Sequence, residues 1–133
     1  MTIELSRSEL AEVAGYAVAC ARPALAIFER DRPGDGRPRA AIEAAQAFAA
    51  GAAFLHPLAK ATQVKHILGS AAHTARALEL SAGGDPVVGA GHLAQSRMLA
   101  PPVVVDVLRR YPAAPSGGGR VGELIRELDA SLR

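Results

Sequence analysis

Apolar residues recur at intervals of three and four positions along most of the chain, which is the spacing of amphipathic helices. Ser6 stands three positions before Glu9, the spacing of a capping box, and predicts a first helix from Ser6 to about Cys20. Pro23 can open a second, short helix because its missing N–H falls in a first turn, where no partner is needed. The pattern therefore predicts two helices before residue 30.

Two further helices are predicted in the middle of the chain. The first runs from about Pro38 to Ala50, with one apolar and one polar face, and Gly51 is a plausible stop. The second is the longest and runs from about Pro57 to Leu80. Its polar positions fall outward or at the border of the apolar face: Lys65, His66, His73, Arg76 and Glu79.

The C-terminal part also favours helices. Asp85 and Pro86 form a cap and first turn for a helix in which Gly89 and Gly91 each cost about 1 kcal/mol of helix propensity. We therefore predict that the backbone of this helix lies close to a neighbouring element, where a larger side chain would not fit. The valine-rich segment 103–111 is interpreted as a buried helix, since no second strand pattern exists to pair with it.

The last element is a helix with a clean apolar stripe, reached through the segment 112–119, "PAAPSGGG", which is predicted to be a flexible loop. This helix either docks on the core or pairs with a partner. The stripe consists of Val121, Leu124, Ile125, Leu128 and Leu132.

Composition agrees with a single all-α domain over residues 1–133, with about six or seven helices packed through small residues. Half the chain is hydrophobic but only 4% is aromatic, so its core must form by close approach of small side chains. The net charge is only +2 and the arginines are scattered along the chain, whereas a nucleic-acid-binding surface needs clustered basic residues. The N-terminus does not look like a signal peptide and no run approaches the roughly 18 apolar residues of a membrane span. We expect a soluble, cytoplasmic protein.

No constellation of residues indicates catalysis, a metal or a cofactor. His66 and His73 are seven positions apart, about 10 Å along a helix, which is too far for one ion. The single cysteine, Cys20, excludes an intramolecular disulfide and gives no ligand spacing. No serine lies in a nucleophile elbow. His92 is the best single candidate for a functional histidine, and its alternative is a core histidine bonded to a neighbouring helix.

The stretch from Arg30 to Ala45 concentrates four arginines, three acids, two prolines and two glycines. Pro33 and Pro38 disfavour a helical conformation at the arginine before each of them. Asp35 is placed to cap the next helix. The arginines can pair with the nearest carboxylates, Asp31 and Glu29, which predicts a self-paired corner. Alternatively, Arg37 or Arg39 remains free to meet an acidic partner or ligand.

The motif "DGRPRAAIEAAQAFAAG", residues 35–51, resembles the signature of the Imm-five-like immunity proteins of bacterial polymorphic toxin systems. "AAHTARALE" around His73 and "GAGHLA" around His92 are similar to the alanine-rich helices of that family. The resemblance covers roughly residues 17–99 and implies an all-helical protein that binds and blocks a cognate toxin inside the producing cell. The candidate binding residues are Asp35, Arg37, Arg39, His73 and His92.

Two other functions stay open. One is a small-molecule or anion-binding regulator, which requires Arg37, Arg39 and His92 to converge around a cleft. The other is a homodimer through the C-terminal helix, whose marker is an exposed stripe on the monomer. If the chain is an immunity protein, a basic nuclease is not the favoured target, because immunity proteins against such toxins are expected to be acidic.

Overall fold

The computed structural model describes residues 4–49 and 64–133, and within them the chain forms six helices and no strand, which confirms the all-α fold. The predicted start of the longest helix near Pro57 falls outside the described residues. The six helices are α1 (Arg7–Asp31), α2 (Arg37–Ala49), α3 (Val64–Ser81), α4 (Pro86–Leu99), α5 (Pro102–Leu108) and α6 (Gly119–Leu132).

Helix α1 begins with the predicted capping box. The Glu9 backbone N–H donates to Ser6 Oγ at 3.1 Å, and the Ser6 N–H donates to Glu9 Oε1 at 2.9 Å. The predicted break at Pro23 is wrong, because α1 continues through this proline for 25 residues. Pro23 lies on the exposed side of the helix, so water can bond the carbonyl that lost its partner. Packing of α1 against helices on two sides outweighs the local propensity to break.

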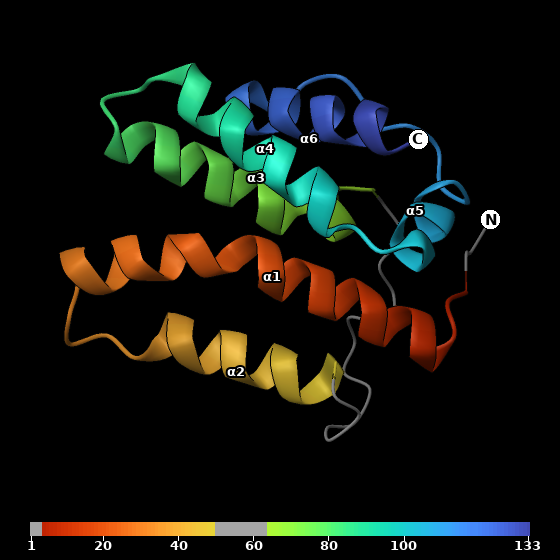
Figure 1. Cartoon of the computed structure of the whole chain (residues 1–133), viewed down its shortest axis with the longest axis horizontal. Coiled ribbons are helices and arrows are strands. Elements are labelled where there is room, and N and C mark those ends of the chain that lie inside the picture. Colours follow the sequence, from red (N-terminus) through yellow and green to blue (C-terminus); the bar gives the residue numbers. More distant parts are fainter. Residues whose placement is uncertain (1–3, 50–63) are drawn as a thin grey trace.

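The helices are arranged in layers around α1 (Figure 1). Helix α2 lies along one side of α1, while α3 and α4 lie along the other and α6 packs beyond them on α3. The short α5 lies at the N-terminal end of α1. Helix α3 contacts α1, α4 and α6, so it connects α1 to the C-terminal helices.

Small residues make the close contacts of the core, as the composition predicted. Ala71, Ala72 and Ala75 of α3 are almost completely buried. Leu124 and Leu128 of α6 are fully buried beside them. The rest of the predicted stripe is buried or half-buried too, so the last helix docks on its own core. The exposed stripe that would mark a homodimer through this helix is therefore not present on the monomer.

A buried ion pair joins α3 to α6. Glu79, predicted to face outward or to lie at the border, is fully buried. Arg120 donates from Nε to Glu79 Oε1 at 3.1 Å and from Nη2 to Oε2 at 2.7 Å, and Arg76 Nη1 donates to Oε1 at 3.3 Å. Hydrogen bonds from Arg120 hold the pKa of Glu79 below its usual range despite burial, and Arg76 adds to this effect. The carboxylate therefore stays charged inside the protein.

Helix α4 crosses directly over this carboxylate at Gly89. A Cβ atom added at Gly89 would lie 2.0 Å from Glu79 Oε2, so no larger residue fits without movement. A Cβ added at Gly91 would meet nothing within 4 Å. The close approach predicted from the two glycines is confirmed for Gly89 and is wrong for Gly91.

The segment before α6 is hydrogen-bonded to that helix. The Ala114 N–H donates to Asp129 Oδ2 at 3.0 Å, and Arg126 Nη1 donates to the carbonyls of Pro115 and Gly117 at 3.1 and 2.7 Å. The flexibility predicted for residues 112–119 stays a prediction, and these bonds argue against it.

Helix α1 is long and apolar enough, by length and composition alone, to cross a membrane. The expectation that no segment approaches such a span is therefore wrong. Core helices of globular domains pass the same test, and in this structure α1 packs against α2 and α3 of its own chain.

Substitution of the two α4 glycines should have opposite effects. Gly89→Ala should destabilise the protein by about 1–3 kcal/mol, because the new Cβ collides with a carboxylate that two arginines hold in place. Gly91→Ala is the matched control and should be neutral or stabilise by up to about 1 kcal/mol through helix propensity. Chemical denaturation of both variants measures the difference, and equal midpoints would contradict the close approach at Gly89.

Candidate functional site

The residues from Glu29 to Arg39, which we call the arginine corner, connect α1 to α2. Asp35 caps α2, because its Oδ1 accepts the Arg37 backbone N–H at 3.0 Å. The same carboxylate receives the Arg37 guanidinium, with Nε at 2.9 Å from Oδ1 and 3.1 Å from Oδ2. The expectation that Pro38 keeps Arg37 out of a helical conformation is wrong, because Arg37 is the first residue of α2. One short stretch of sequence thus builds both the cap and the ion pair.

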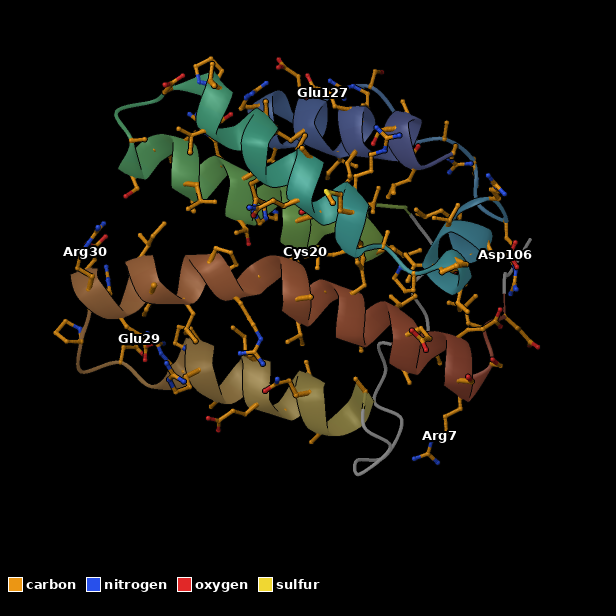
Figure 2. All side chains as sticks on the ribbon, in the orientation of Figure 1. Arg7, Cys20, Glu29, Arg30, Asp106 and Glu127 are labelled. Atoms are coloured by element: carbon orange, nitrogen blue, oxygen red, sulfur yellow. The ribbon has the colours of Figure 1, made fainter. Side chains whose placement is uncertain are left out.

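A second pair links the two helices. Arg39 Nε donates to Glu29 Oε2 at 2.9 Å, and its Nη2 donates to Glu29 Oε1. Arg30 leaves the opposite side of α1, where its Nη2 donates to Ser81 Oγ at the end of α3 at 3.2 Å. Figure 2 shows Glu29 and Arg30 pointing to these opposite sides. The end of α1 is therefore held to both neighbouring helices.

The predicted self-paired corner is confirmed. Glu29 is the partner of Arg39 as expected, whereas Asp31 pairs with Arg30 and not with Arg37 or Arg39. Pairing with Arg37 and Arg39 lowers the pKa of the Asp35 and Glu29 carboxyls below their usual values.

Pairing does not remove the corner arginines from solvent. The Arg37 side chain is 84% exposed and that of Arg39 is 53% exposed. Each guanidinium is held in position by a carboxylate and still presents N–H groups to an approaching molecule. The alternative in which Arg37 or Arg39 remains free is therefore wrong, because both are paired, although both side chains stay accessible to solvent.

His92 belongs to the core. It is 4% exposed on α4, beside Cys20 of α1, and four positions further along α4 the Ser96 carbonyl accepts a hydrogen bond from the Tyr16 hydroxyl at 2.9 Å. Neither ring nitrogen of His92 makes a regular hydrogen bond in the described part of the chain. Burial lowers the pKa of His92, an effect partly offset by the nearby Cys20 backbone. Burial also raises the pKa of the Cys20 thiol.

The other candidate histidine, His73, is exposed on α3 and does not contact the arginine corner through any hydrogen bond or ion pair of the described residues. The position of His56 and the side chain of His66 lie outside the described residues. No three potential metal ligands come together among the residues that the structure describes.

The convergence required for an anion-binding cleft is not observed. His92 lies beside Cys20, whereas Arg39 binds Glu29, which is nine residues or about 13 Å further along α1. Helices α2 and α4 also lie on opposite sides of α1 (Figure 1). Arg37, Arg39 and His92 therefore cannot surround one ligand.

Sequence reasoning missed two charged residues. The sequence pointed to Glu79 only indirectly. Gly89 in α4 predicted that another group lies close to the helix backbone, but not that this group is the Glu79 carboxylate. Arg32 was recognised as restricted by Pro33, but nothing local showed that it would be left without a partner. In the structure its side chain makes no ion pair or hydrogen bond with another described residue, unlike Arg30, Arg37 and Arg39.

Comparison with known families gives one match. The family model described as "Imm-5 like putative immunity protein" matches residues 4–95, which is more than half of the chain and includes the arginine corner, His73 and His92. Curated proteins and solved structures gave no match.

The two halves of the Asp35–Arg37 pair should differ in their contribution to stability. Asp35→Ala removes both the α2 cap and the ion pair, whereas Arg37→Ala removes only an exposed pair, and such pairs contribute little. We expect Asp35→Ala to lower the denaturation midpoint clearly more than Arg37→Ala. Equal losses would mean that the cap contributes nothing.

His92 should make the protein less stable in mild acid. Its folded-state pKa lies below the unfolded value of about 6.5, so the unfolded chain binds a proton that the folded chain does not. The free energy of unfolding should therefore fall as pH decreases below 6.5. Carboxyl groups with a lowered pKa, such as Glu79, reduce the free energy of unfolding only at lower pH, below about 4.5. His92→Phe should flatten the slope between pH 6.5 and 5, and the control His73→Gln should retain it.

Proposed function

Because the chain belongs to the family of Imm-5 like putative immunity proteins, we propose that it binds a cognate toxin in the cytoplasm of the producing cell and neutralises it by covering its active site. The protein itself performs no catalysis in this proposal. The arginine corner forms the binding surface.

The observation that carries this proposal is the exposure of guanidinium groups whose positions are already fixed. Arg37 and Arg39 are held by Asp35 and Glu29 before any partner arrives, so binding orders fewer side chains. Arginine is enriched among the residues that contribute most to protein interfaces. The corner also lies inside the stretch that matches the family.

Burial of Cys20 and His92 supports a role in binding. The Cys20 thiol is completely buried with a raised pKa, so it is a poor nucleophile. The His92 ring is buried on α4, a helix that lies on the opposite side of α1 from α2 (Figure 1). A substrate at the arginine corner would therefore reach neither group.

The charge of the chain indicates the kind of toxin surface. The net charge of +2 and the exposed guanidinium groups favour an acidic surface on the toxin. A basic nuclease would be repelled at the corner. We therefore propose a toxin whose active site is bordered by carboxylates.

Affinity capture from the source cell followed by a growth assay tests the proposal. The wild type should retain a protein that arrests growth when expressed alone and is harmless when co-expressed with this chain. The double variant Arg37→Ala, Arg39→Ala should lose most of the capture and the protection. Arg97→Ala is the matched control, because Arg97 is an exposed arginine on α4 that pairs with no other described residue.

Two results would overturn the proposal. One is a captured protein that is harmless when expressed alone. The other is protection that the double variant retains in full, which would remove the arginine corner from the binding surface. Unfolding curves of all variants exclude loss of folding as the cause.

A further inference from the structure

A groove opens beside the arginine corner, between the C-terminal third of α1 and the start of α2. Its volume is about 390 Å³. Apolar side chains make its walls, and the C-terminal half of α3 contributes one edge. The residues that define it are Ala24, Leu25 and Phe28 of α1, Pro38 and Ile42 of α2, and Ala77 of α3.

The packing of this chain leaves the groove incompletely covered. Phe28, Ile42 and Ala77 are only half-buried, although the core has few large side chains and the whole chain has three phenylalanines. Exposed apolar surface of this kind, rimmed by charged residues, marks interaction sites. The groove has little polar surface inside it to orient a small polar ligand.

The rim of the groove carries Arg32, whose charge is not paired with any other residue that the structure describes. Asp31 and Arg32 both line it, and Asp31 pairs with Arg30. Arg37 is bound to Asp35 and Arg39 to Glu29, so among the described residues Arg32 is the arginine of the corner that lacks a partner. A bound molecule that places a carboxylate at this point would form an ion pair with Arg32.

The backbone under Arg32 is fixed before binding. Its N–H donates to the Phe28 carbonyl at 2.8 Å, which is the last bond of α1, and Pro33 restricts its conformation on the other side. Phe28, the acceptor of this bond, also lines the groove. The point where the Arg32 side chain leaves the backbone is therefore fixed beside the apolar wall of the groove.

We propose that this groove receives a large apolar side chain of the toxin, and that Arg32 pairs with an aspartate or glutamate adjacent to that side chain in the toxin sequence. The inference rests on the proposed function and specifies the toxin surface that the corner recognises. The groove supplies the apolar contact, and the arginine supplies the charge selectivity.

Selection from a random library of displayed 12-residue peptides tests the recognition chemistry without the toxin. The immobilised wild-type chain should enrich peptides in which Leu, Ile, Met or Phe adjoins Asp or Glu. Arg32→Glu should lower their recovery about tenfold and shift the preference toward neighbouring Lys or Arg. Arg97→Glu is the control and should select as the wild type does. Absence of the motif, or equal recovery on Arg32→Glu, overturns the inference.

Photo-crosslinking with the toxin identified by capture tests the occupant. Benzoylphenylalanine in place of Asp31, at the rim, should form a crosslink to a toxin peptide that contains an apolar residue beside an acid. The same group in place of the exposed Glu127 of α6, distant from the rim (Figure 2), should form none.

The outcomes separate this inference from the proposed function. Protection from the toxin without a crosslink at position 31, or a crosslink there to a second copy of this chain, overturns the groove as the toxin site and leaves the proposed function standing. Selection of the peptide motif without any neutralised toxin overturns both the proposed function and the toxin as occupant.

Discussion

The buried carboxylate of Glu79 is the interaction on which the C-terminal half of the domain depends. It is fully enclosed, and it remains charged because Arg120 and Arg76 bond both of its oxygens. An unpaired carboxylate at this depth would be very unfavourable, so α3 and α6 must stay together. Helix α4 in turn can lie over the pair only because Gly89 has no side chain. Three helices therefore meet at one charged group.

The sequence predicted the parts of the fold that depend on neighbouring residues. The capping box at Ser6, the cap at Asp85 and the apolar stripe of α6 all appear as expected. The break at Pro23 was wrong because helix propensity is local, whereas the continuity of α1 comes from helices packed along it. Glu79 was misplaced because its main partner is 41 positions away in the chain, which no local pattern reveals.

The same distinction applies to the candidate site. The cap by Asp35 and the pairing of the corner arginines could be predicted, because their partners are at most ten positions away. The groove could not, since its walls come from three helices whose mutual placement is set by the core. For the same reason the sequence could not show that Arg32 would lack a partner within the described part of the chain. Nor could it show that the helix of His92 would lie on the other side of α1 from the helix of Arg37 and Arg39.

Helix α2 carries one wall of the groove and two of the corner arginines, yet none of its described side chains belongs to the hydrophobic core. Its tertiary contacts run mainly to α1. Residues on this helix can therefore be exchanged while the α1, α3 and α6 core keeps its free energy of folding. The part of the proposed binding surface that α2 supplies and the hydrophobic core are therefore built from different side chains, so this part of the surface can change in sequence while the packing of the core stays the same.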